Sequence, residues 1–250
     1  MNKETAAYIF QIFRYDSKAP EKEPSFATYR VRALPGLTVL SALLMIRDEM
    51  DGSLGLRCSC RSAVCGSCAM VMNGAIGLAC RTQVAALGSE TIILEPLPNF
   101  EILKDLVVDM TPFWTMYQKV QPWLMRKSPV PAGEVHQTEE ERNRIDQFVN
   151  CILCAACYGA CPVLARDPEY LGPAALAKLE RFILDSRDER PLSVLEAVNS
   201  EQGVWGCDTL FKCIDACPKD VRPTDAVIGL RKTLVKYKFK KFLGVMPDEA

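Results

Sequence analysis

Apolar and polar residues alternate in several short segments of the first hundred residues, and this period of two is typical of half-buried β-strands. The Asn73-Gly74 pair between two of these segments predicts a tight hairpin turn. Residues 38–50 instead repeat their apolar positions at helical spacing, and Thr38 can cap the start of that helix. The expected strands are residues 8–15, 27–33, 69–72, 76–80 and 91–95. The pattern therefore predicts a small α+β domain.

A different pattern begins after Pro96-Leu97-Pro98, which ends the last expected strand. From about Asp105 we expect the chain to become helical, and it is rich in Trp, Tyr and Met there. The segment from Thr138 to Glu141 has the form of a helix start. We therefore expect two domains, residues 1–104 and residues 105–250, of which the second is all-helical. The expected helices of the second domain are residues 141–149, 172–185, 191–199 and 224–237.

Twelve cysteines add chemistry to this picture, because eleven of them form three sets with iron–sulfur spacing. The first set has the spacing C-x4-C-x2-C and is closed by a distant fourth cysteine, an arrangement that holds a plant-type [2Fe–2S] cluster. Its members are Cys60, Cys65, Cys68 and Cys80. The small residues Gly66 and Ser67 inside the loop let backbone N–H groups approach the sulfurs. The first domain is thus predicted to be a β-grasp ferredoxin module of the plant type.

The other two sets lie in the helical region. One has the spacing C-x2-C-x2-C-x3-C-P of bacterial two-cluster ferredoxins, in which the fourth cysteine ligates the other cluster. The second copy of this run holds Leu210 where a cysteine is expected. When the fourth ligands are exchanged, the expected [4Fe–4S] ligands are Cys151, Cys154, Cys157 and Cys217, and the expected [3Fe–4S] ligands are Cys161, Cys207 and Cys213. The sequence therefore predicts a bacterial-type two-cluster module with iron held by cysteines alone.

Zinc sites, disulfides and other iron ligands are the alternatives to consider for these cysteines. Zinc is not the expected metal, because zinc sites usually group their ligands as two close pairs. Disulfides are not expected either, because we find no secretory signal. Cys58 lies outside the C-x4-C spacing, so it is either a spare thiol or a substitute ligand. At the Leu210 position, Asp208 or water could instead complete a [4Fe–4S] cluster.

Composition limits the remaining functions. The 250 residues carry a net charge of −1, which gives no electrostatic basis for nucleic-acid binding. The one histidine, His136, lies in a polar stretch and cannot by itself supply a bis-histidine haem site. No apolar run is long enough for a membrane span, so we expect a soluble protein or a peripheral subunit of a membrane complex. No catalytic constellation for bond chemistry is present in the sequence.

Together the modules resemble the iron–sulfur subunits of the succinate dehydrogenase and fumarate reductase family (complex II). The resemblance rests on the module order, the spacing of all eleven cysteines, the RSAVCGSC segment after Cys60, and the segment LGPAALAKLERFILDSRDER between the two C-terminal runs. It covers nearly the whole chain.

This resemblance implies a three- or four-subunit enzyme that interconverts succinate and fumarate in the tricarboxylic acid cycle or in anaerobic respiration. Electrons would pass singly from covalent FAD in a flavoprotein subunit through the [2Fe–2S], [4Fe–4S] and [3Fe–4S] clusters in that order. Their acceptor would be a quinone near a membrane-anchor subunit of the cytochrome b type, and haem b would lie in that partner subunit rather than in this chain. The chain would lie on the cytoplasmic side of the inner membrane.

Some residues depart from the family pattern around the quinone. Ubiquinone-reducing members carry a Trp and a His where this chain has Ala165-Arg166 and Asp208, and this difference favours menaquinone and fumarate reduction. The basic segment from Arg231 to Lys241 is either a solvated helix face or a docking site for anionic lipid headgroups. Two other functions remain open: the cluster subunit of another flavin-dependent acid dehydrogenase or of a thiol-linked fumarate reductase, and a free-standing ferredoxin-like carrier.

Overall fold

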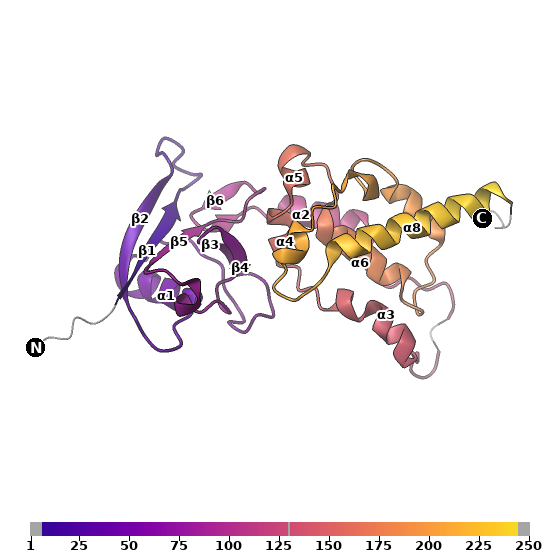
Figure 1. Ribbon diagram of the computed structural model, residues 1–250, viewed down its shortest axis with the longest axis horizontal. Coiled ribbons are helices and arrows are strands. Elements are labelled where there is room, and N and C mark those ends of the chain that lie inside the picture. The colour runs from indigo at the N-terminus through magenta and orange to yellow at the C-terminus, as the bar shows by residue number, and fades with distance from the viewer. Residues whose placement is uncertain (1–6, 130, 245–250) are drawn as a thin grey trace, which may run out of the picture. The chain divides into compact units, whose positions relative to one another are not determined.

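A computed structural model describes residues 7–129 and 131–244 of the chain (Figure 1). The chain divides into two compact units. One unit contains the residues up to Met110 together with the segment Ile152–Ala160, and the other contains Thr111–Cys151 and the residues from Cys161 onward. The segment 152–160 thus belongs to the first unit although both of its flanks belong to the second.

The first unit is built on a mixed sheet of five strands in the order β2-β1-β5-β3-β4. Its strands are β1 (Ala7–Arg14), β2 (Ser25–Arg32), β3 (Ala69–Met72), β4 (Ala75–Leu78) and β5 (Thr91–Glu95). β5 lies parallel to β1, while β2 and β3 lie antiparallel to their neighbours. At the β3–β4 turn both Asn73 and Gly74 have positive φ, as a two-residue hairpin requires. The predicted β-grasp arrangement is therefore confirmed.

The predicted helix divides into α1 (Val39–Met45) and a final π-helical turn, Ile46–Met50. Thr38 caps α1 as expected, because its side-chain oxygen accepts a hydrogen bond from the backbone N–H of Ser41 at 3.0 Å. Leu43 and Ile46 on the helix are fully buried, as are Phe10 and Ile12 on β1. The spacing of apolar residues thus located the core of this unit correctly.

The prediction that the chain becomes helical from Asp105 was wrong. A small antiparallel sheet of β6 (Ile102–Lys104) and β7 (Val107–Val108) occupies this region, and α2 begins only at Thr111 (Thr111–Lys119). Asp105 has a φ of 49° in the turn, and its buried carboxylate accepts hydrogen bonds from the Arg14 side chain and the Gly55 backbone N–H. These tertiary bonds favour a turn at Asp105 over continuation as a helix.

The segment 152–160 is attached to the first unit by contacts around Tyr158. The Tyr158 ring stacks on Phe100, with ring centroids 4.6 Å apart. The side-chain amide of Asn99 donates hydrogen bonds to the carbonyl oxygens of Tyr158 and Gly159, at 3.0 and 3.1 Å. The segment contains the short helix α4 (Ala156–Gly159).

The second unit is helical, in agreement with the prediction. Its helices, apart from α2, are α3 (Glu139–Val149), α5 (Pro162–Arg166), α6 (Gly172–Ile183), α7 (Lys212–Asp215) and α8 (Pro223–Phe242), together with 3-10 segments at Leu192–Val198 and Val204–Gly206. The helix expected at 191–199 is thus a 3-10 helix, and α8 continues five residues beyond its predicted end. α3 begins with the expected capping box between Thr138 and Glu141.

Helices α6 and α8 approach each other closely at Gly229. A Cβ atom added there would lie 2.0 Å from Oε1 of Glu180, so only glycine fits opposite this carboxyl group. Glu180 is 5% exposed, and its Oε2 has no hydrogen-bond partner among the described residues. Burial therefore raises the pKa of Glu180 to about 7, since the charged form loses its hydration.

We expect the stability of this unit to fall as pH rises through the titration of Glu180. The Glu180 carboxyl group binds its proton more tightly in the folded state than in the unfolded chain, where its pKa is near 4.5. Burial of the charged Glu180 carboxylate therefore lowers the free energy of unfolding. This loss is small below pH 4.5 and fully present above about pH 7, where it is on the order of 3 kcal/mol. Glu180→Gln should raise the unfolding temperature at pH 8 and leave it nearly unchanged at pH 4. An equal shift at both pH values would contradict this account.

Candidate iron–sulfur centres

The loop between Cys60 and Cys68 turns its backbone N–H groups toward cysteine sulfurs. Cys60 Sγ accepts hydrogen bonds from the backbone N–H groups of Ser62, Val64 and Cys65, at 3.2–3.3 Å. The neighbouring N–H of Ala63 donates to Cys80 Sγ at 3.3 Å. Left-handed backbone conformations at Arg61, Ala63 and Gly66 produce this inward curl. The first predicted set is thus brought together by the loop and by Cys80, which follows β4.

The thiols of this set differ in their surroundings. The Ser67 hydroxyl, 3.1 Å from Cys65 Sγ, lowers the pKa of Cys65 to about 6. Burial raises the pKa of Cys68 to about 12, and the nearby sulfurs of Cys80 and Cys65 add to the effect. Several N–H donors around anionic sulfurs are the surroundings that an iron–sulfur cluster requires. The residues present therefore fit a [2Fe–2S] cluster.

Cys58, which lies outside this cysteine set, has Arg47 as a neighbour. It lies close enough to Arg47 to raise the pKa of that guanidinium, although the larger cause is the hydrogen bond from Arg47 to Asp48. Cys58 thus lies beside the π-helical turn that follows α1.

The predicted three-cysteine set lies within the second unit. Burial raises the pKa of both Cys161 and Cys213, and the sulfurs of this set raise it further because they lie near one another. Tyr170, 1% exposed, packs among them: its pKa is raised first by burial and then by Cys207, Cys161 and Cys213. The Thr224 hydroxyl, at the start of α8, lies 3.0 Å from Cys213 Sγ.

The two C-terminal cysteine runs have the same local backbone. In the first run Leu153 and Ala155 have positive φ, and Ala155 leads into the four-residue helix α4. In the second run Thr209 and Phe211 have positive φ, and Phe211 leads into the four-residue helix α7. Leu210 thus occupies the backbone position that Cys154 has in the first run, and its side chain is 56% exposed.

The four cysteines of the remaining set are distributed over both units. Cys151 and Cys217 pack against one buried group in the second unit, formed by Phe148, Ala177, Val221 and Ala226. Burial raises the pKa of Cys217, and Cys151 adds to this shift. Cys154 and Cys157 lie in the segment 152–160 of the first unit.

Gly66 allows the [2Fe–2S] loop to approach Cys154 closely. A Cβ atom at position 66 would lie 2.7 Å from the Cα atom of Cys154, and the φ of +73° also favours glycine. Sequence reasoning assigned Gly66 only to the sulfurs of its own loop and missed this contact. It also missed Tyr170 and Thr224, since neither residue belongs to a spacing motif.

Two of the three residues that were expected to depart from the ubiquinone-reducing pattern, Arg166 and Asp208, form an ion pair. The Arg166 guanidinium donates to both carboxylate oxygens of Asp208, at 3.0 and 3.2 Å. No three or more His, Cys, Asp or Glu side chains within residues 7–129 and 131–244 are arranged to hold a single metal ion. The described helices include none that is both long and apolar enough to cross a bilayer. None of the twelve cysteines, all of which are described, is joined in a disulfide.

Two family models match the two parts of the chain. Residues 9–115 match the 2Fe-2S iron-sulfur cluster binding domain, and residues 147–221 match the 4Fe-4S dicluster domain. The fold and these matches define a two-module iron–sulfur protein.

Similar proteins narrow this class. The chain is 39% identical to the fumarate reductase iron-sulfur subunit of Mycobacterium tuberculosis, over 94% of this chain and 96% of that protein. It is 43% identical to a mitochondrial succinate dehydrogenase [ubiquinone] iron-sulfur subunit of Oryza sativa, over 89% of this chain and 80% of that protein. A chain of the Mycobacterium smegmatis Sdh1 complex in the apo form superposes with a TM-score of 0.81 at 25% identity, over 94% and 98% of the two chains. The chain belongs to the family of iron–sulfur subunits of succinate dehydrogenases and fumarate reductases, and it is therefore a subunit of an enzyme complex.

Proposed function

We propose that this chain carries electrons between FAD in a flavoprotein subunit and a quinone at a membrane-anchor subunit of the cytochrome b type. When bound, the clusters supply one-electron carriers between two cofactors that each exchange two electrons. The observation that carries the proposal is the arrangement of cysteines in a chain that aligns along almost its whole length with iron–sulfur subunits of this family. The chain would lie as a peripheral subunit on the cytoplasmic side of the inner membrane.

The proposed ligands follow the three cysteine sets. They are Cys60, Cys65, Cys68 and Cys80 for [2Fe–2S], Cys151, Cys154, Cys157 and Cys217 for [4Fe–4S], and Cys161, Cys207 and Cys213 for [3Fe–4S]. The N–H groups turned onto Cys60 and Cys80 support the first set, and the mutual proximity of Cys161, Cys207 and Cys213 supports the third.

The position of Gly66 and the sequence of the Cys151–Cys161 run support the electron-transfer order [2Fe–2S], [4Fe–4S], [3Fe–4S]. Gly66 lies between two ligands of the first set and touches the backbone of Cys154, a ligand of the second. Cys157 and Cys161 belong to one run but to different sets, so the chain itself joins the second site to the third.

We infer that the quinone is menaquinone and that the complex works as a fumarate reductase. Ala165-Arg166 and Asp208 support this assignment, because they stand where ubiquinone-reducing members of the family carry the Trp and His of the quinone pocket, and Arg166 and Asp208 are joined as an ion pair.

An EPR-monitored redox titration of the intact membrane complex tests the proposed function. We expect a three-iron signal in the oxidised state and a [2Fe–2S] signal on reduction, with potentials suited to menaquinone. Absence of the three-iron signal would refute the assignment of Cys161, Cys207 and Cys213.

Thr224→Val should lower the reduction potential of the three-iron centre. The hydroxyl of Thr224 can donate to the anionic sulfur of Cys213, and such a bond favours the more negative, reduced state. At a fixed potential we expect the ratio of reduced to oxidised centre to fall about tenfold, or 59 mV for one electron. EPR titration measures this shift.

Thr233→Val is the matched control, because the Thr233 hydroxyl lies on the same helix and donates instead to the Gly229 carbonyl. Thr224→Ser should restore the potential. Equal shifts in the two valine variants would mean that Thr224 acts only through the fold of α8.

A further inference from the structure

The C-terminal half of α8 carries an unusual charge. Residues 231–243 contain six lysines and arginines and no acidic residue. These residues are Arg231, Lys232, Lys236, Lys238, Lys240 and Lys241. The rest of the chain balances acidic and basic residues closely, since the overall charge is −1.

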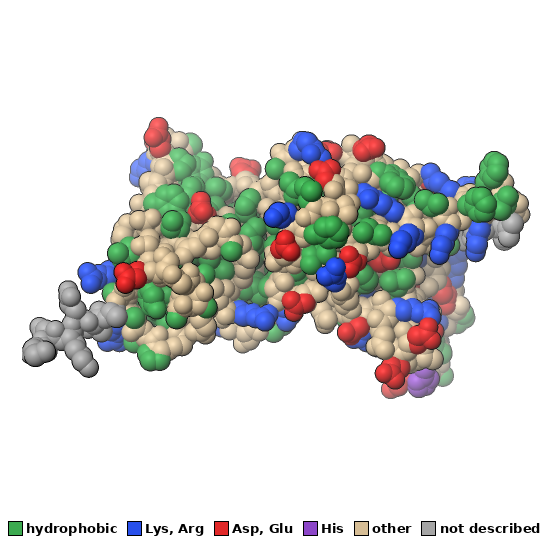
Figure 2. Space-filling view, viewed as in Figure 1, with side chains coloured by type: hydrophobic (Ala, Val, Ile, Leu, Met, Phe, Trp, Pro, Cys, Tyr) green, Lys and Arg blue, Asp and Glu red, His purple; other side chains and the backbone are tan. Residues whose placement is uncertain are grey.

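One face of this half of the helix is apolar and uncovered. Val235, Phe239 and Phe242 repeat at the spacing of a single helix face, and Leu243 lies beside them. Their exposed fractions are 57%, 63%, 86% and 54%. In Figure 2, blue side chains follow α8 and green ones gather near its C-terminal end.

The opposite face packs against the helix's own unit. Leu230 and Leu234 are 0–1% exposed and Tyr237 is 7% exposed. Packing within the unit therefore accounts for one apolar stripe of α8 but not for the other.

Three of the lysines border the uncovered stripe. Lys232 and Lys236 lie one helical turn from Val235 and Phe239, and Lys240 lies one turn beyond Lys236. Lys238, in contrast, is 3.9 Å from Glu196, and Lys241 lies over the Tyr237 ring. The contact lysines are thus Lys232, Lys236 and Lys240.

We propose that this outer face of α8 is a docking surface for anionic lipid headgroups. An apolar stripe with aromatic side chains and a lysine border lies in the interface of a bilayer, where the rings enter the acyl boundary and the lysines reach the headgroups. The absence of acidic residues between 231 and 243 favours a uniformly anionic surface over a protein surface of mixed charge. This surface is independent of the proposed electron transfer.

Vesicle sedimentation with the full-length, cluster-containing protein tests this inference. The protein should bind vesicles that contain phosphatidylglycerol, bind pure phosphatidylcholine vesicles weakly, and dissociate as salt is added. Each basic residue near an anionic surface strengthens binding roughly fivefold. The triple variant Lys232→Glu, Lys236→Glu and Lys240→Glu should therefore weaken binding on the order of a hundredfold or more.

Two controls make the outcome specific. Reversal of Lys18, Lys22 and Lys127, which are exposed lysines outside α8, changes the net charge equally and should change binding by a few fold at most. Phe239→Ser should weaken binding at high salt, where the apolar contact dominates. Cluster absorbance verifies that every variant is folded and loaded.

Equal losses in the two triple variants would overturn the proposal, because they would show a response to net charge alone. It would also be overturned if the α8 variant bound vesicles normally but no longer purified with the membrane-anchor subunit, since the face would then recognise protein. A failed EPR titration with normal vesicle binding would refute the electron-transfer function and leave the docking surface intact.

Discussion

Leu210→Cys should convert the proposed three-iron centre into a four-iron centre. The backbone at Leu210 repeats the conformation at Cys154, with left-handed residues on both sides and a four-residue helix after it. A thiol there would start from the backbone position that the proposed ligand Cys154 has in the first run. We expect the three-iron EPR signal to disappear and the iron content to rise by one atom per chain. The added thiolate carries negative charge and should therefore also lower the reduction potential of the centre.

Leu210→Ala is the control for this substitution. It removes the leucine side chain without offering a ligand, and Leu210 is half exposed, so the fold should tolerate both variants. The three-iron signal should survive in the alanine variant. If the cysteine variant also kept an unchanged three-iron spectrum, the shape of the site rather than the missing thiolate would determine the cluster type.

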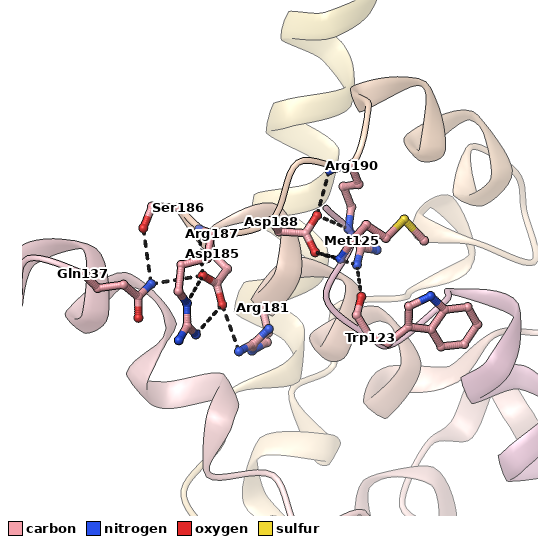
Figure 3. A network of polar contacts seen from close by, with 9 residues as sticks. All are labelled: Trp123, Met125, Gln137, Arg181, Asp185, Ser186, Arg187, Asp188 and Arg190. Atoms are coloured by element: carbon pink, nitrogen blue, oxygen red, sulfur yellow. Dashed lines mark hydrogen bonds and ion pairs between the residues drawn. The ribbon is translucent and has the colours of Figure 1, made fainter. Parts of the chain in front are cut away.

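Arg190→Ala should destabilise the second unit strongly. The Arg190 and Asp188 side chains are 2% and 1% exposed and form an ion pair at 2.7 Å. Arg190 also donates to the carbonyl oxygen of Trp123 at 2.6 Å, while Asp188 accepts from the Met125 backbone N–H, so the pair holds the connector that follows α2 (Figure 3). Removal of the arginine leaves a buried carboxylate without its cation, which costs about 3–5 kcal/mol. Thermal unfolding of the cluster-containing protein measures the loss.

Arg187 offers a matched comparison. Its partner Asp185 also binds Arg181 at 2.9 Å and accepts from the Gln137 amide, so Asp185 stays compensated when Arg187 is removed (Figure 3). Arg187→Ala should therefore cost much less than Arg190→Ala. The double variant Arg190→Met with Asp188→Leu should recover most of the stability, because it leaves no unpaired charge. Similar losses for Arg187→Ala and Arg190→Ala would contradict this account.

Local patterns predicted most of the fold, and tertiary contacts account for the errors. β5 and the Asn73-Gly74 turn follow from alternation and turn chemistry, and both lie where they were expected. The two-stranded sheet at 102–108 was missed because it depends on Asp105, whose partners Arg14 and Gly55 are distant in sequence. The 3-10 helix at Leu192–Val198 likewise has the composition of an α-helix, and local pattern does not distinguish the two.

The candidate sites were predictable to the extent that ligand spacing is local. Cysteine spacing grouped Cys60 with Cys65, and the backbone N–H groups of the loop do converge on the sulfur of Cys60. Tyr170 and Thr224 reach the third cysteine set through packing, so no spacing rule could have found them. The close approach of Gly66 to Cys154 joins residues far apart in sequence for the same reason.

The segment 152–160 has a practical consequence for dividing this protein. A fragment that ends near Met110 would lose Tyr158, leaving the Phe100 ring without its stacking partner and the Asn99 amide without its two carbonyl acceptors. A fragment that begins near Thr111 would keep Cys154 but remove the surface on which its segment folds. No single cut therefore yields two intact halves. Laboratory recombination between relatives should likewise succeed only when residues 152–160 come from the same parent as the first 110 residues.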